Sequence, residues 1–78
     1  MRTLQEEAIA QLVMSKLCND QRTCGQTIDV YVVDGDLFLV GWCDKEEQKV
    51  AAEIIASGTY GIRTVIDKIQ IRHISQSI

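Results

Sequence analysis

The chain has 78 residues, the size of one small domain, and its formal net charge at neutral pH is −3. This mild negative charge excludes nonspecific binding of duplex nucleic acid as a first expectation, because such binding needs clustered lysine and arginine to neutralise phosphates. A domain of this size buries only about 60 to 65 % of its unfolded surface, so a dimer interface would add to a thin stability margin.

The expected cellular location follows from the apolar runs and the cysteines. No apolar run reaches the roughly 18 to 20 residues that span a bilayer. The first residues, MRTLQEEAIAQL, carry acids where a signal peptide has an apolar centre. Three cysteines leave one unpaired, which suits a reducing compartment better than a disulfide framework. We therefore expect the chain as given to be cytoplasmic, an expectation that a leader lost from a trimmed sequence would overturn.

The N-terminal segment predicts an amphipathic helix of about four turns that begins near Leu4. Thr3 and Glu6 have the spacing of a capping box, in which each side chain accepts a hydrogen bond from the other residue's backbone N–H. Apolar residues then recur at three- and four-residue steps, which predicts packing on a core. The residues expected to face that core are Leu4, Ala8, Ile9, Leu12, Val13 and Leu17.

Residues 18–26, CNDQRTCGQ, predict a loop because Asn, Asp and Gly cluster there without apolar periodicity. Cys18, Cys24, Cys43 and His73 have the donor types of a Cys₃His zinc site. The gap between the first two cysteines is wider than the spacing of about two to four residues in a zinc knuckle. We therefore expect free thiols and no metal site, and a Cys18–Cys24 disulfide under oxidation stays open.

The stretch IDVYVVDGDLFLVGWC, residues 28–43, predicts a β-hairpin around the two-residue turn Asp34-Gly35. Both residue types tolerate the positive φ angles of a type I′ turn, and the flanking apolar alternation strengthens the prediction. With this turn, Val33 faces Asp36. Period-two alternation gives one aliphatic side, expected to face the core: Ile28, Val30, Val32, Leu37, Leu39 and Gly41.

The opposite side of the hairpin is mostly apolar, where a solvent-facing side would be polar. It carries Asp29, Tyr31, Val33, Phe38, Val40 and Trp42. A hairpin that is apolar on both sides is either covered on both sides or presents an exposed patch, and exposed patches usually mark contact surfaces.

A second helix is predicted over about residues 45–57. Asp44 is the expected N-cap, and Glu46 and Glu47 fall in the first turn, where the helix dipole favours negative charge. Gly58 is the expected left-handed C-cap. The expected apolar stripe is Val50, Ala51, Ile54 and Ile55, with Ala52 and Ala56 keeping the helix slim.

The segment from Ile62 predicts a third strand, led by Val65 and Ile66. Its apolar side holds Ile69 and Ile71, and its polar side holds Lys68, Gln70 and Arg72. We expect His73 at the surface and a frayed C-terminal tail.

The order helix, strand, strand, helix, strand (αββαβ) predicts an α+β fold for a single domain, residues 1–78. It should consist of a three-stranded mixed sheet with two helices packed on one face. The crossover rule makes the second and third strands parallel, while the strand order stays open.

Three sequence blocks that follow the first predicted helix resemble the BON domain. They are I-x-V-x-V-x-D-G-x-L-x-L-x-G from Ile28 to Gly41, E-x-x-x-A-A-x-I-x-A from Glu47 to Ala56, and G-I-x-x-V-x-D-x-I-x-I from Gly61 to Ile71. The resemblance covers nearly the whole chain, and its specificity comes from the order and spacing of the blocks.

The resemblance implies an α+β, non-enzymatic binding module without catalytic residues. It also implies association with phospholipid membranes and with protein or polysaccharide partners, often in bacterial envelopes. A periplasmic or envelope-associated location is therefore expected if the sequence is a trimmed piece. BON domains usually place small polar residues where this chain has Phe38, Val40 and Trp42, so its open sheet face is more apolar than the family pattern.

The candidate binding site is this open sheet face, comprising Tyr31, Phe38, Val40, Trp42, Lys68 and Arg72. Aromatic side chains suit a membrane interface and cations suit anionic headgroups, so attachment to a phospholipid membrane surface is the first functional hypothesis. The alternative is a protein-interaction module, most simply a homodimer that buries the same face. Nucleic acid is not an expected partner.

Nothing in the sequence favours catalysis. There is a single histidine, no pair of acids in an evident pocket and no glycine-rich phosphate loop after a strand. We expect no enzymatic activity, no cofactor and no metal.

Overall fold

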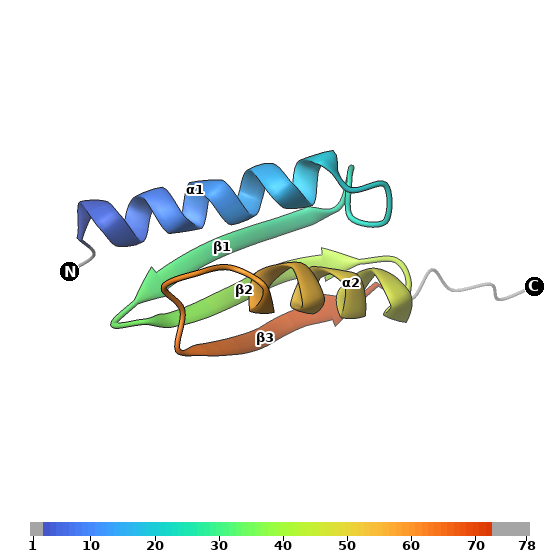
Figure 1. Cartoon of the computed structure of the whole chain (residues 1–78). Helices are drawn as coiled ribbons and strands as arrows, with labels where there is room; N and C mark the ends of the chain where they lie inside the picture. Colours follow the sequence, from blue (N-terminus) through green and yellow to red (C-terminus); the bar gives the residue numbers. More distant parts are fainter. Residues whose placement is uncertain (1–2, 73–78) are drawn as a thin grey trace, which may run out of the picture.

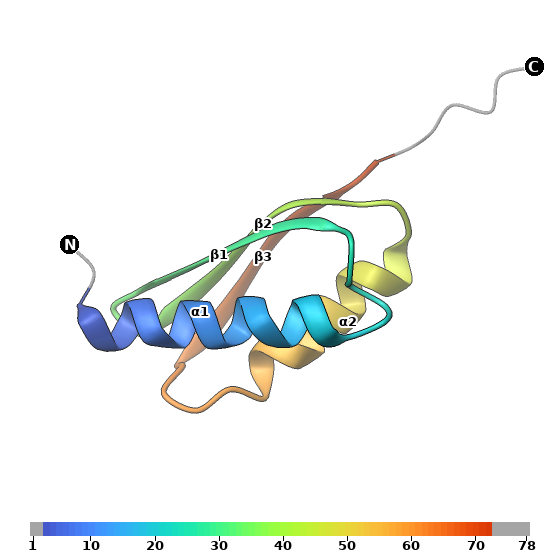
Figure 2. The same ribbon diagram turned by 90° about the horizontal axis from the view of Figure 1, so that it is seen from above.

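The computed structural model describes residues 3–72, in which two helices and three strands follow the predicted order (Figure 1). The elements are α1 (Leu4–Asn19), β1 (Thr27–Val33), β2 (Asp36–Cys43), α2 (Glu46–Ser57) and β3 (Thr64–Ile71). Both helices lie on the same side of the strands, so the molecule has one helical layer and one sheet layer (Figure 2). The predicted α+β fold is confirmed. The expectations for His73 and the tail lie outside the described residues.

The sheet has the strand order β1-β2-β3, with β2 in the centre. β2 pairs antiparallel with β1 and parallel with β3, so the sheet is mixed as predicted. The connection between the two parallel strands runs through α2, as parallel neighbours require a crossover segment. This arrangement settles the strand order that the sequence left open.

The hairpin closes at the predicted turn. Asp34 has φ 54° and Gly35 has φ 84°, so both residues have the positive φ of a type I′ turn. Val33 pairs with Asp36, and the register runs from there to the opposite end of β1. The predicted register is therefore confirmed.

The aliphatic side of the hairpin forms the centre of the core. Val30, Val32, Leu37 and Leu39 are almost completely shielded from solvent, and Ile28 is partly buried. α1 packs on β1, and α2 packs on β2 and β3. The remaining buried members of the core are Ala10, Val13, Leu17, Cys43, Ala52, Ala56 and Ile69.

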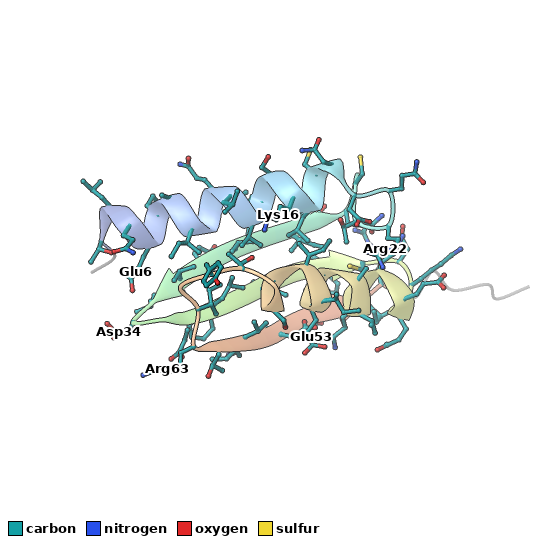
Figure 3. All side chains as sticks on the ribbon, in the orientation of Figure 1. Glu6, Lys16, Arg22, Asp34, Glu53 and Arg63 are labelled. Carbon is teal, nitrogen blue, oxygen red and sulfur yellow. The ribbon has the colours of Figure 1, made fainter. Side chains whose placement is uncertain are left out.

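The start of α1 is also confirmed, together with its capping box. Thr3 Oγ1 accepts a hydrogen bond from the Glu6 N–H at 3.1 Å, and Glu6 Oε1 accepts one from the Thr3 N–H at 3.0 Å. Glu6 Oε2 accepts a further hydrogen bond from the Asp34 N–H at 2.6 Å. This carboxylate therefore joins the first turn of α1 to the hairpin turn, and the two lie at the same end of the molecule in Figure 3.

The predicted core stripe of α1 is wrong at three positions, because Leu4, Ala8 and Leu12 are exposed. The buried positions are Ala10, Val13 and Leu17, with Ile9 half-buried. In this orientation Glu6 lies on the same side of the helix as the buried residues and reaches the hairpin turn. Residues three and four apart lie on one face of a helix. Glu6, Ala10, Val13 and Leu17 have this spacing and therefore share the face that is turned toward the sheet.

Lowering the pH is expected to destabilise the protein through Glu6. The hydrogen bond from the Thr3 N–H, with smaller contributions from Asp34 and Gly35, holds the pKa of the Glu6 carboxyl below its ordinary value of 4.5. The stability gained in this way is fully present above about pH 4.5 and is lost as the pH falls through the lowered, folded-state pKa. Urea unfolding midpoints at several acidic pH values should therefore fall less steeply for Glu6→Gln than for the unmodified chain.

Glu53→Gln is the matched control for this pH series. Glu53 is an exposed carboxylate on α2 with no side-chain hydrogen bond among the described residues (Figure 3). Its substitution makes the same chemical change at a position that does not contact the hairpin turn, so a difference between the two variants reports the contacts of Glu6. Equal acid sensitivity of Glu6→Gln and the unmodified chain would contradict the role given to Glu6.

The predicted ends of α2 need correction. The N-cap is Lys45 rather than Asp44, because Gln48 Oε1 accepts hydrogen bonds from both of their N–H groups at 2.9 Å and so sets the start of the helix. Gly58 follows the helix with φ −83°, so it is not a left-handed cap. The positive φ in this connection belongs to Gly61, at 88°.

The core face of α2 consists mainly of alanines. Ala51, Ala52 and Ala56 are buried and Ile55 is half-buried, whereas Val50 and Ile54 are exposed. The predicted stripe is therefore wrong for Val50 and Ile54. Alanine has the smallest side chain that a helix face can bury, so these three positions allow the helix to lie close to β2 and β3.

The hairpin turn also contacts the segment that leads into β3. The Gly35 carbonyl accepts hydrogen bonds from the Arg63 N–H at 2.7 Å and from the Thr64 N–H at 3.4 Å. The Arg63 guanidinium lies 3.2 Å from the Asp36 carboxylate. Together with Glu6, these bonds attach the turn to two segments that are distant in the sequence.

Candidate functional site

The face of the sheet opposite the helices contains the predicted binding residues. Strand pairing determines its membership, because directly paired residues point to the same side of a sheet. We call this surface the outer sheet face, and it consists of Thr27, Asp29, Tyr31, Val33, Asp36, Phe38, Val40, Trp42, Thr64, Ile66, Lys68 and Gln70.

The side chains on the outer sheet face form rows that cross all three strands. The three main rows, each written from β1 through β2 to β3, are Tyr31–Phe38–Ile66, Asp29–Val40–Lys68 and Thr27–Trp42–Gln70. The middle row has an apolar residue between an acid and a base. The face therefore has an apolar centre with charged residues of opposite sign at its two sides.

Solvent reaches the large apolar side chains of this face. Trp42 is 45 % exposed, Tyr31 40 % and Val40 37 %, while Phe38 is half-buried between its neighbours. An exposed contiguous apolar surface of this kind usually marks a contact site. The structure thus brings together these four predicted residues, with Lys68 exposed beside them.

Arg72 belongs to the edge of this surface. It follows the last residue of β3, and its N–H donates a hydrogen bond to the Cys43 carbonyl at 2.6 Å. Its Nε lies 3.8 Å from Asp44 Oδ1, and both side chains are about half exposed. Because Asp44 offsets the charge of Arg72, the predicted contribution of this cation to an anionic surface is reduced.

Sequence reasoning omitted Ile66 from the site. Ile66 is half-buried and pairs with Phe38, so it extends the aromatic row onto β3. The sequence does carry a signal for it, because Ile66 lies two residues before Lys68 and alternate residues of a strand point to the same side. Asp29 was placed on this side of the hairpin, but its position level with Lys68 depends on the strand order.

Two hollows lie at different places on the molecule. One, of about 340 Å³, is lined by Trp42 and Arg72 at the end of the sheet. The other, of about 430 Å³, lies between α1 and α2 and is lined by Ser15, Lys16, Asn19, Asp20, Ile54, Ile55 and Gly58. The hollow at Trp42 and Arg72 adjoins the outer sheet face, so an aromatic ring and a cation lie together at the edge of that face.

The cysteines occupy two different environments. Cys18 and Cys24 are free and exposed, whereas Cys43 is buried. Burial, followed by the nearby Asp67 and Asp44 carboxylates, raises the pKa of the Cys43 thiol. This thiol therefore stays protonated at neutral pH, the form that is a poor nucleophile. Within residues 3–72, no three His, Cys, Asp or Glu side chains lie together in a way that could hold a metal ion.

Two helices on one face of a mixed three-stranded sheet, with an apolar and partly aromatic surface on the other face, define an α+β architecture. The family model of the BON domain matches residues 5–73, and the chain belongs to the BON domain family. BON domains are generally non-catalytic binding domains. A search of curated proteins gives no match. Neither α1 nor α2 is long and apolar enough to cross a membrane.

Proposed function

We propose that this chain is a non-enzymatic binding module that attaches to phospholipid membrane surfaces through its outer sheet face. The observation that carries the proposal is the exposure of Trp42 and Tyr31 on an apolar sheet face, with Lys68 and Arg72 at its side. Tryptophan and tyrosine favour the membrane–water interface because one part of the ring system is apolar and the other is polar. Membership of the BON domain family, which is associated with membrane binding, supports the same reading.

Apolar burial rather than charge is expected to supply most of the attachment energy. Completing the burial of an aromatic side chain that is now about 40 % exposed contributes about 2 kcal/mol. A basic residue near an anionic surface contributes about 1 kcal/mol, and here Asp29 and Asp44 oppose the two cations. Attachment should therefore occur on zwitterionic as well as anionic bilayers and should depend only weakly on salt.

Trp42 provides a direct test, because it is the single tryptophan of the chain and lies on the proposed contact surface. Adding phosphatidylcholine vesicles, with or without phosphatidylglycerol, should shift its emission to shorter wavelength and reduce its quenching by iodide. The protein should also float with the vesicles in a density gradient. An unshifted emission together with no recovery in the lipid fraction, for both vesicle types at low salt, would overturn the proposal.

A pair of matched variants locates the contact surface. Val40→Asp introduces a charge at the centre of the outer sheet face and should abolish flotation, because a carboxylate there would have to leave water. Ile54→Asp makes the same change at an exposed apolar residue of α2, on the helical side of the molecule, and should leave flotation unchanged. Flotation of Val40→Asp at the level of the unmodified chain would show that the contact lies elsewhere.

A further inference from the structure

We propose that, in the absence of a membrane, the outer sheet face is covered by a second copy of this chain. The two copies pack face to face about a twofold axis that runs along β2. This dimer uses the same surface as the proposed membrane attachment, but its formation does not require that the protein bind lipid.

The charges of the middle row fit this symmetry. Asp29, Val40 and Lys68 are level with one another on β1, β2 and β3. A twofold axis along β2 places β1 of one copy over β3 of the other and keeps every row at its own level. Asp29 then faces Lys68 of the second copy, and the same contact recurs on the other side of the axis.

A face-to-face arrangement with the axis across the strands is disfavoured by the same residues. An axis that runs across the strands through the middle row would place each strand over its own copy. Asp29 would then face Asp29, and Lys68 would face Lys68. Like charges opposed at an interface are repulsive, so the charge pattern selects the axis along β2.

The apolar side chains also match under the selected symmetry. Asp36, Phe38, Val40 and Trp42 lie on the axis strand and meet their own copies, while Tyr31 faces Ile66 of the second copy. The Arg63 guanidinium lies 3.2 Å from the Asp36 carboxylate and offsets its charge at this end of the interface. Packed sheets are rotated by about 30° through their twist, so this alignment is closest at the middle row. The result is an apolar centre bordered by charge pairs, the usual organisation of a protein interface.

The side chains that would form the charge pairs are available for a partner. Asp29 and Lys68 are both exposed, and neither has an ion pair with another residue in the described part of the chain. Pairs at the border of an interface add little affinity but fix the relative orientation of the partners. Their role here is to select one arrangement of an apolar contact.

The size of the face predicts a weak dimer. β2 has 8 residues, so the face is about 26 Å long and, over three strands, about 14 Å wide. The resulting footprint of about 400 Å² per copy is half of the roughly 800 Å² per partner found in standard stable interfaces. We therefore expect a dissociation constant of about 10 to 100 µM, which allows the two copies to separate and free the face.

Sedimentation equilibrium of the full chain, in reducing buffer without lipid, tests the dimer. Asp29→Lys and Lys68→Asp each oppose like charges and should raise the dissociation constant at least about tenfold. The double exchange, Asp29→Lys with Lys68→Asp, restores opposite charges and should return the constant to within about threefold of the unmodified value. Lys16→Asp is the control, because it makes an equal charge change at an exposed residue of α1, and it should leave dimerisation unchanged (Figure 3).

The outcomes separate this dimer from other assemblies and from the membrane proposal. A monomer at about 500 µM, a dimer lost on adding reductant, or a double exchange that fails to restore association would each overturn it. The vesicle assay is read independently on the unmodified chain, at a concentration well below that at which two copies associate. If the chain dimerises with charge rescue but does not float with vesicles, the dimer is retained and membrane attachment is overturned. If the chain floats with vesicles but stays monomeric without lipid, membrane attachment is retained and the dimer is overturned.

Discussion

Replacing Gly41 with alanine is expected to remove a large part of the stability of the protein. Gly41 lies in β2 with φ 144°, a conformation that residues with a side chain rarely adopt. An added Cβ would lie 2.0 Å from the Thr27 carbonyl oxygen and 3.0 Å from Ile28 Cα, so the paired strand β1 would have to move. Strain and overlap together should cost about 3 to 6 kcal/mol. A chain of this length has a total stability of only about 4 to 12 kcal/mol.

Gly25→Ala separates the two causes of this loss. Gly25 has φ 87°, but an added Cβ there would meet nothing within 4 Å. Its substitution should therefore cost only the backbone strain, about 1 kcal/mol. Urea titrations followed by circular dichroism compare the two variants directly. If both variants unfold at the same urea concentration, overlap with β1 is not the reason that position 41 is glycine.

Replacing Leu39 with alanine is expected to have the next largest effect. Leu39 is completely buried in the central strand, between both neighbouring strands and beneath the helices. Truncation of such a leucine removes its burial energy and leaves a cavity, with a combined cost of about 3 to 5 kcal/mol. The urea midpoint should fall accordingly, measured at a protein concentration well below that at which copies associate.

Val40→Ala is the control one residue further along the same strand. Val40 points to the outer sheet face and is 37 % exposed, so its truncation should cost less than about 1 kcal/mol in the monomer. The comparison tests which side of the hairpin faces the core. A larger loss for Val40→Ala than for Leu39→Ala would reverse the assignment of the two faces.

The hairpin was predictable because its determinants are local. A two-residue turn fixes the register of the strands on either side, and period-two alternation then assigns each side chain to a face. Asp34 and Gly35 therefore sufficed to predict the paired positions. The capping box of Thr3 and Glu6 was predictable for the same reason, since both hydrogen bonds lie within one turn of helix.

The rotation of α1 could not be predicted from its own residues. Its apolar side chains form two overlapping stripes, one containing Leu4, Ala8 and Leu12 and the other containing Ala10 and Val13. Packing against the rest of the fold distinguishes them: the second stripe is buried, and Glu6 on the same side hydrogen-bonds the hairpin turn 28 residues away. At α2, similarly, Gln48 determines the N-cap through its side-chain conformation, which the spacing of charges does not specify.

The residues that the hairpin contributes to the outer sheet face were predictable, whereas Ile66 was missed and the arrangement of the rows could not be predicted. Alternation alone assigned Phe38, Val40 and Trp42 to one side of β2. The rows depend on β3 lying beside β2 in parallel, a pairing that joins residues more than twenty positions apart. The alignment of Asp29 with Lys68, on which the selected symmetry depends, therefore required the structure.

The hydrogen bonds of the hairpin turn determine where extra residues can be inserted into the chain. Hairpin tips are ordinarily favourable sites for extra residues, because few bonds there involve the rest of the chain. The turn at Asp34 and Gly35 is hydrogen-bonded to the first turn of α1 and to the segment before β3. A tag inserted at this turn would therefore break the contacts of the turn with both segments. Residues 20–26 make mostly short-range bonds, and that loop is the better place for a fusion partner or for new termini.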